Sequence, residues 1–161
     1  MITTTTMADV VVAGVIKLNP THQKYCPSHA VIKDYDHWTL ALRPNQATLG
    51  AGVIVAKCTP DILSVGALSA AAGVEFLHVV ADFERALRAA FGASKFNYIC
   101  LMMVDLQPHF HAIPRYEHAP TFLGQSYVDL GWPKMADLQV NVLDDDTLRP
   151  QLIQALRAQL N

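Results

Sequence analysis

Two histidines and a glutamine within one short segment, Gln107-Pro108-His109-Phe110-His111, are the side chains of this sequence best suited to chemistry. Residues two apart on a β-strand point to the same face, so these three would converge if a strand begins as early as residue 107. Histidine, with an unperturbed pKa of about 6.5, can act near pH 7 as nucleophile, acid or base. One imidazole could attack phosphorus while the other imidazole and the carboxamide donate to the non-bridging oxygens. The segment therefore predicts a phosphoryl- or nucleotidyl-transfer site.

The His-x-His pattern is also compatible with two other interpretations. His109 and His111 could be partly buried structural residues that are hydrogen-bonded to backbone carbonyls. They could also be two ligands of a metal ion, since histidine pairs on a strand are common ligands. A metal site would need a third ligand, for which Asp105, His37 and Glu117 are the nearest candidates, and no spacing supports any of them.

The composition limits the classes of partner. The chain has 161 residues, of which 52% are hydrophobic and 16% are charged. These values predict one domain, 1–161, that can bury a core without cross-links. Because the formal net charge is −2, there is no basic excess to bind a nucleic-acid backbone, and we expect no nucleic acid polymer as a partner. A small phosphorylated ligand needs only a few donors and is compatible with this charge.

The cysteine content and the N-terminal residues bear on the compartment. Cys26, Cys58 and Cys100 are widely spaced and odd in number, which argues against a disulfide framework and favours a reducing environment. The apolar stretch 10–16 is too short for a membrane span and lacks the features of a signal peptide. We therefore expect a cytoplasmic protein without membrane contact, with Met7 as an alternative start.

Hydrophobic periodicity predicts the elements that position the segment. Residues 37–43 alternate, placing Trp38, Leu40 and Leu42 on one face of a half-buried strand. A β-branched run within 50–57 predicts a second strand, antiparallel to the first if a hairpin connects them. Residues 68–91 predict a long helix with one apolar stripe. That stripe consists of Phe76, Val80, Phe83, Leu87 and Phe91.

The other segments complete an α+β pattern. The continuous apolar run 96–104 predicts a central strand, and 109–114 predict the next one. Residues 1–35 and 117–143 carry prolines, glycines and polar residues, so we expect them to be irregular. Leucines at i+4 spacing predict a C-terminal helix over 148–160. The order of elements predicts an antiparallel sheet with the long helix packed on it.

The string 109–116, His-Phe-His-Ala-Ile-Pro-Arg-Tyr, resembles the end of the histidine-triad (HIT) motif, His-φ-His-φ-His-φ-φ, followed by the Pro-Arg that many members of that superfamily carry. The strand, loop, strand, helix and strand predicted upstream resemble the same superfamily in order and kind. The resemblance covers about 37–116, leaving 117–161 as a C-terminal extension. It implies a five-stranded α+β fold with two helices, a homodimer, and activity on dinucleoside polyphosphates, nucleoside phosphoramidates or adenylylated conjugates.

By this resemblance, His109 matches the middle histidine, the nucleophile that forms a nucleotidyl-histidine intermediate. His111 matches the third histidine, which assists at the phosphate, and Asn45 lies near a ribose-contacting Asn or Asp. The sequence departs from the pattern at Ala51-Gly52, where many members have Gly-His entering the second strand, and at two positions expected near the phosphate. Gln107 replaces the first histidine, and Met103 stands where relatives carry a phosphate-binding Gln or Asn. Glutamine can donate to a phosphate oxygen but cannot shuttle protons, and methionine can do neither.

The sequence thus predicts a HIT-like nucleotide hydrolase or nucleotidyl transferase with His109 and His111 as catalytic residues. Gln107 and Asn45 are expected to bind a small nucleotide ligand, and no cofactor or metal is implied. The two departures favour an alternative, a non-catalytic nucleotide-binding or regulatory protein with a degenerate triad. A weaker alternative is a metal-binding protein that uses the two histidines.

Overall fold

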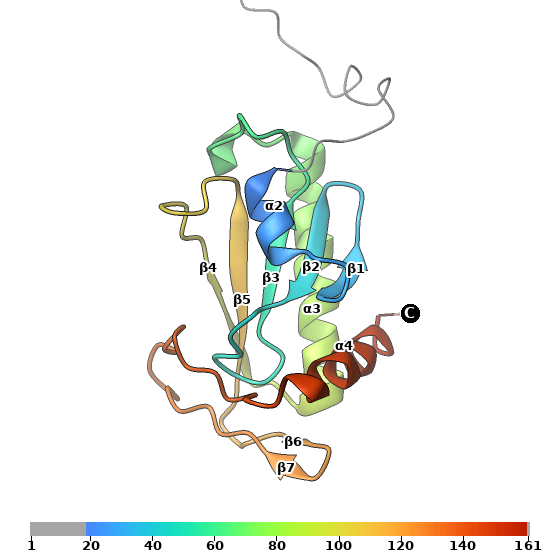
Figure 1. Ribbon diagram of the computed structural model, residues 1–161, viewed down its shortest axis with the longest axis vertical. Coiled ribbons are helices and arrows are strands. Elements are labelled where there is room, and N and C mark those ends of the chain that lie inside the picture. Colours follow the sequence, from blue (N-terminus) through green and yellow to red (C-terminus); the bar gives the residue numbers. More distant parts are fainter. Residues whose placement is uncertain (1–18, 161) are drawn as a thin grey trace, which may run out of the picture.

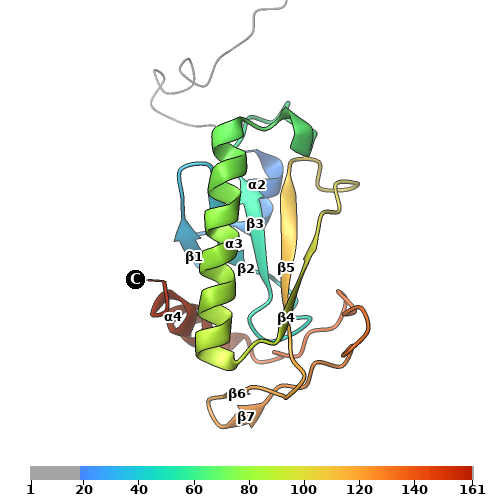
Figure 2. The ribbon, with the colours of Figure 1, turned by 180° about the vertical axis from the view of Figure 1, so that it is seen from behind.

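The computed structural model describes residues 19–160. Its centre is a five-stranded antiparallel sheet in the order β1-β2-β3-β5-β4. The strands are β1 (Val31–Asp34), β2 (Trp38–Leu42), β3 (Gly52–Ala56), β4 (Lys95–Ile99) and β5 (His109–Arg115). Figure 2 shows the long helix α3 (Ala70–Phe91) lying along one face of this sheet, and Figure 1 shows the short helix α2 (Pro20–Tyr25) on the opposite face. The predicted α+β architecture is confirmed.

Helix α3 has clear start and stop signals. The Ser69 hydroxyl caps its first turn by accepting from the Ala72 N–H at 3.1 Å, and Gly92 ends it in the left-handed region at φ +67°. The helix predicted over 68–91 is therefore confirmed, with its start two residues later. Phe83 and Leu87 of the predicted stripe are fully buried against the sheet.

The two faces of the sheet carry separate apolar clusters, because strand residues alternate between faces. The cluster beneath α3 includes Leu40, Leu42, Ile54 and Ala112. The cluster on the α2 side includes Ala41, Val53 and Val55, next to Tyr25 and Cys26. Phe110 packs on Phe76 of α3 with ring centroids 4.6 Å apart. The alternation therefore places its neighbours His109 and His111 on the α2 side.

The strands predicted over 37–43, 50–57 and 109–114 are confirmed as β2, β3 and β5. The strand predicted over 96–104 is wrong in length and position, since β4 ends at Ile99 and forms an edge of the sheet. Its last pair joins Ile99 to His111, close to the start of β5, so little of β5 is left to pair with later residues. The chain then enters a loop in which Met103 and Val104 are 86% and 85% exposed. Apolar content alone does not distinguish such a loop from a buried strand.

The expectation that residues 1–35 are irregular is wrong for 19–35, while residues 1–18, including Met7, lie outside the described part. Asn19 caps α2 by accepting from the His22 N–H at 2.8 Å, and Pro20 occupies the first turn. Strand β1 has four residues and an irregular register against β2. Both elements are too short for periodicity to reveal, and contacts with the rest of the chain stabilise them.

The segment 117–143 is largely irregular, as expected, and includes a small hairpin of β6 (Thr121–Phe122) and β7 (Gln125–Ser126). It is nevertheless anchored by a buried ion pair in which Arg115 Nε lies 2.7 Å from Asp129 Oδ2. The predicted C-terminal helix is confirmed as α4 (Arg149–Arg157), preceded by the 3-10 turn η2 (Asp146–Leu148); a further turn, η1 (Val65–Ala67), precedes α3. Within the described residues, no helix combines the length and apolar character needed to cross a membrane.

Candidate functional site

His109 begins β5 and is fully buried on the α2 side of the sheet. Its Nδ1 lies 2.8 Å from the Gln107 carbonyl oxygen, and because a carbonyl only accepts, Nδ1 carries the proton. In a neutral ring, Nε2 then holds a free lone pair. Among the described residues, His109 Nε2 is the one buried side-chain nitrogen or oxygen without a hydrogen-bond partner. A buried polar atom left unpartnered calls for an explanation, and a free imidazole lone pair can accept a hydrogen bond or act as a nucleophile.

His111 lies two residues further along the same face. Its ring centroid is 5.3 Å from that of His109, at an interplanar angle of 90°. The Nε of Arg43 donates to His111 Nδ1 at 3.3 Å. Burial, and then the positive charge of Arg43, lower the pKa of His111 to about 4, and the electrostatic interaction with His109 acts in the same direction. His111 is therefore neutral at pH 7, with its proton on Nε2, where it is available as a hydrogen-bond donor.

Gln107 lies just before β5, because the strand does not extend back to residue 107. Its Oε1 accepts from the Thr21 hydroxyl at 2.8 Å, and its Nε2 donates to the Pro60 carbonyl at 2.9 Å. Both ends of the carboxamide thus join α2 to the loop after β3. The Gln107 backbone carbonyl is the group that contacts His109.

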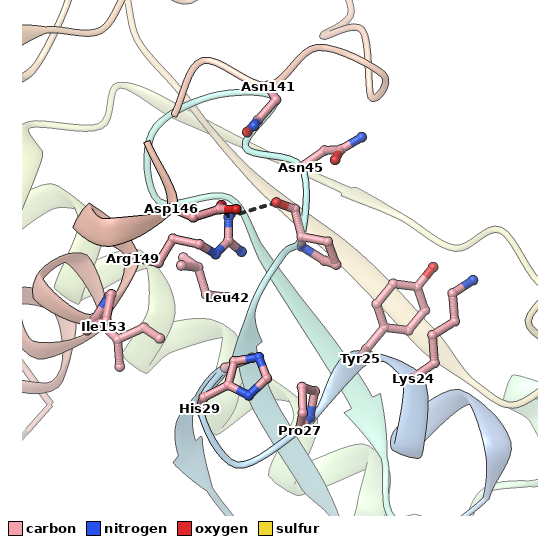
Figure 3. Close-up of a pocket in the computed structure, with 13 residues that line it drawn as sticks. Lys24, Tyr25, Pro27, His29, Leu42, Asn45, Asn141, Asp146, Arg149 and Ile153 are labelled. Atoms are coloured by element: carbon pink, nitrogen blue, oxygen red, sulfur yellow. Dashed lines mark hydrogen bonds and ion pairs between the residues drawn. The ribbon is translucent and has the colours of Figure 1, made fainter. Parts of the chain in front are cut away.

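A cavity of about 540 Å³ lies between α2, the loop after β2 and the start of α4. Asn45 is one of its wall residues, together with His29, Asn141 and Arg149. Figure 3 shows Asn45 and Asn141 near one another and Tyr25 at the side of the cavity. Neither His109 nor His111 is part of the wall.

Tyr25 connects the cavity to the two histidines. Its ring stacks on His109 at a centroid distance of 5.6 Å and meets His111 edge-on at 5.7 Å, while it also forms part of the cavity wall. The Tyr25 hydroxyl donates to Asp105 Oδ2 at 2.8 Å, and Lys24 donates to both oxygens of the same carboxylate. Tyr25 therefore covers the imidazoles from the side of the cavity, held there by Asp105.

The fold that carries these residues is found in solved structures. A histidine triad protein from Sinorhizobium meliloti matches with a TM-score of 0.63 and 17% identity, over 91% of this chain and 98% of that one. A histidine triad protein from Bradyrhizobium japonicum matches with a TM-score of 0.62 and 19% identity, over 81% of this chain and 90% of that one. The chain has the histidine-triad fold.

A third solved structure, a hypothetical histidine triad nucleotide-binding protein from Sulfolobus tokodaii, matches with a TM-score of 0.60 and 15% identity, over 81% of this chain and 83% of that one. No protein-family model matches the sequence, and no curated protein matches it significantly. At these identities the likeness is one of fold, and the chemistry has to be argued from the residues of this chain.

Within the histidine-triad fold, the two sequence departures have different structural settings. Gln107 is buried and its side chain holds other parts of the chain together. Met103 lies in the exposed loop after β4 and supplies no hydrogen-bond donor. The donor to an imidazole comes instead from Arg43, whose Nε donates to His111, while the ring of Tyr25 packs on both histidines.

Sequence reasoning missed both of these residues. Tyr25 belongs to a helix of six residues, which is too short to show a period. Arg43 directly follows an alternating strand, and a charged residue in that position is only a weak signal of a site. Each reaches the histidines through contacts between segments that are far apart in the sequence.

The metal alternative lacks a third ligand in the part of the chain that is described. Residues 19–160 contain no group of three or more His, Cys, Asp or Glu side chains that could hold a metal ion. Asp105, one of the candidate third ligands, is bound to Lys24 and Tyr25.

Proposed function

We propose that this protein is a nucleotide hydrolase or nucleotidyl transferase of histidine-triad type, acting on nucleoside phosphate derivatives with His109 as the nucleophile. The observation that carries the proposal is the unpartnered, buried Nε2 of His109, whose lone pair is left free by the bond from Nδ1 to the Gln107 carbonyl. A similar fold in a protein described as nucleotide-binding supports the substrate class.

In the proposed reaction, the nucleoside part of the substrate occupies the cavity and Asn45 contacts the ribose. Tyr25 moves aside, because His109 is otherwise covered. The Nε2 lone pair attacks the α-phosphorus, an Nε2–P bond forms, and the bond from phosphorus to the leaving group breaks. The leaving group departs with the electron pair and takes a proton from solvent.

Water then attacks the phosphorus of the intermediate and releases a proton to solvent. The Nε2–P bond breaks, its electron pair returns to His109, and a nucleoside monophosphate with its extra oxygen from water is released. The Nε2–H of His111 stabilises the negative charge on the non-bridging oxygens in both steps. Gln107 would contribute a further donor only if its amide left the Pro60 carbonyl.

A non-catalytic nucleotide-binding protein is the second candidate. It is favoured by the Gln107 amide, which is already bonded at both ends, and by the exposure of Met103. Fewer donors at the phosphate would leave binding intact and slow turnover.

We also propose a homodimer. Within residues 19–160, strand β4 is an edge of the sheet, so one row of its backbone groups has no strand neighbour, and Val74 and Leu77 are 61% and 66% exposed on α3. Pairing of two β4 edges would bury both features. Light scattering of the purified protein tests this: a monomer mass at micromolar concentration would refute it.

The deciding experiment incubates the protein with adenine and guanine dinucleoside polyphosphates and phosphoramidates, followed by mass spectrometry without acid treatment. We expect a nucleotidyl adduct on the peptide that contains His109, and none in His109→Ala. Binding of nucleoside monophosphate by calorimetry with no adduct and no product would support the non-catalytic alternative. Neither binding nor adduct would refute both.

A further inference from the structure

Arg43 lies beside the proposed site in a fixed position. Its backbone N–H donates to the Ala51 carbonyl at 2.9 Å, which continues the pairing of β2 with β3. Its side chain is nearly completely buried. Nη1 donates to the Asn45 carbonyl at 2.6 Å, and Nη2 donates to the Leu138 carbonyl at 2.9 Å. Two carbonyls therefore orient the guanidinium plane, and that plane directs Nε–H toward His111.

The contact between Arg43 and His111 restricts the imidazole to one protonation pattern. A guanidinium has only donors and stays protonated in proteins. Since Arg43 Nε donates to His111 Nδ1, this nitrogen has to be the acceptor, and the single proton of the neutral ring has to be on Nε2. A histidine without such a partner is free to exchange between its two neutral forms.

The surrounding charges also keep His111 neutral. The groups that face it are Arg43 from the end of β2, His109 from β5, Asp105 from the loop after β4, and Lys24 from α2. Tyr25 meets it edge-on as an uncharged phenol. Only Asp105 favours the imidazolium, and it is bound to Lys24. Within the described residues, no carboxylate forms an ion pair with Arg43, so its positive charge acts on His111 without a counterion.

We propose that Arg43 is a positioning residue that locks His111 as the neutral Nε2–H form, so that this histidine is a hydrogen-bond donor and never a base. The consequence for catalysis rests on the proposed function, whereas the protonation pattern does not. In a chain whose first triad position is a glutamine with both ends of its amide hydrogen-bonded, the oriented Nε2–H belongs to a ring whose centroid lies 5.3 Å from that of His109.

The first test uses the wild-type protein. Long-range proton–nitrogen NMR correlation distinguishes protonated from unprotonated imidazole nitrogens, with the His111 signals assigned by their loss in His111→Gln. We expect a bare Nδ1 and a protonated Nε2 at pH 7, unchanged until the pH approaches about 4. A protonated Nδ1, or an imidazolium at pH 7, would overturn the proposal.

The second test uses Arg43 variants. Arg43→Met keeps the apolar stem and removes the charge and the donors, so His111 should show mixed neutral forms and a pKa raised toward the ordinary value. Arg43→Lys retains a cation and a donor and should restore the low pKa in part. Arg88→Gln, which loses an exposed ion pair with Glu84, is the matched control and should leave the neutral form and the pKa of His111 unchanged.

Kinetics separate positioning from structural support. For Arg43→Met we expect kcat to fall by roughly 10-fold to 10²-fold, with KM changed less. The upper value is about the effect of losing one oriented hydrogen-bond donor at the phosphate. Equal kcat in Arg43→Met and wild type, or an unchanged His111 pattern in a folded Arg43→Met, would overturn the proposal. If the His109 adduct is absent but the His111 pattern is as expected, the proposed function fails and the positioning by Arg43 stands. If Arg43→Met does not fold, the wild-type spectrum and Arg43→Lys still decide.

Discussion

Replacing Gln107 with alanine tests what this residue does in place of a triad histidine. The substitution removes the bonds from the Thr21 hydroxyl at 2.8 Å and to the Pro60 carbonyl at 2.9 Å, and with them a longer one from the Thr21 N–H at 3.4 Å. All of these lie in a largely buried region, with Gln107 only 4% exposed and Thr21 only 2% exposed. The Pro60 carbonyl loses a donor, and α2 loses a connection to the loop after β3.

The magnitude follows from those contacts. Each of the two short bonds contributes about 1 kcal/mol net, and a buried group left without its partner adds to the cost. We therefore expect the free energy of unfolding to fall by about 2–3 kcal/mol. For a domain of this size, 1 kcal/mol corresponds to roughly 2–4 °C in Tm, so the melting temperature should drop by about 5–10 °C.

The assay is urea unfolding, followed by the fluorescence of the buried Trp38 and by circular dichroism. Gln139→Ala is the matched control, because its side chain is exposed, and it should stay within about 0.5 kcal/mol of wild type. A loss below about 0.5 kcal/mol for Gln107→Ala would refute the structural role. Its amide would then be free to donate a hydrogen bond to a phosphate oxygen.

Four further predictions concern the site and its support. His109→Ala should abolish the nucleotidyl adduct and turnover while retaining its circular dichroism spectrum; residual turnover equal to wild type would exclude His109 as the nucleophile. Tyr25→Ala should speed the carbethoxylation of His109 by diethyl pyrocarbonate, measured by peptide mass spectrometry, whereas Tyr25→Phe keeps the covering ring and should stay slow. Folding lowers the pKa of His111, so as the pH falls the unfolded chain binds a proton at this histidine before the folded chain does. The free energy of unfolding should therefore decrease between about pH 6.5 and about pH 4. In urea titrations at several pH values, His111→Gln should flatten this dependence. Asp129→Ala leaves the Arg115 guanidinium buried without its carboxylate and should lower the free energy of unfolding by about 3 kcal/mol. This is the lower end of the usual cost of removing one partner of a buried ion pair, because the Asn97 side chain and the Lys134 carbonyl also accept from Arg115. A cost below about 1 kcal/mol would contradict the reasoning.

The sequence by itself determined the elements with a clear period. The stripe of α3, the alternation of β2 and the β-branched run of β3 are local patterns, and the backbone geometry of helices and strands turns them into faces. The same rule places His109 and His111 together on one face of β5, opposite Phe110. The core of the candidate site could therefore be predicted from the spacing of its residues.

The tertiary structure decided which groups meet those histidines. Arg43 reaches His111 across 68 positions, and Thr21 reaches Gln107 across 86. No local pattern encodes such contacts, because they depend on how α2 and the loops pack on the sheet. The end of β4 at Ile99 has the same cause: apolar residues follow it, but strand pairing stops where β5 begins. Backbone periodicity determined which residues share a face of the sheet. Packing between distant segments determined which residues contact the two imidazoles: Arg43 at His111 Nδ1, and Tyr25 over both rings.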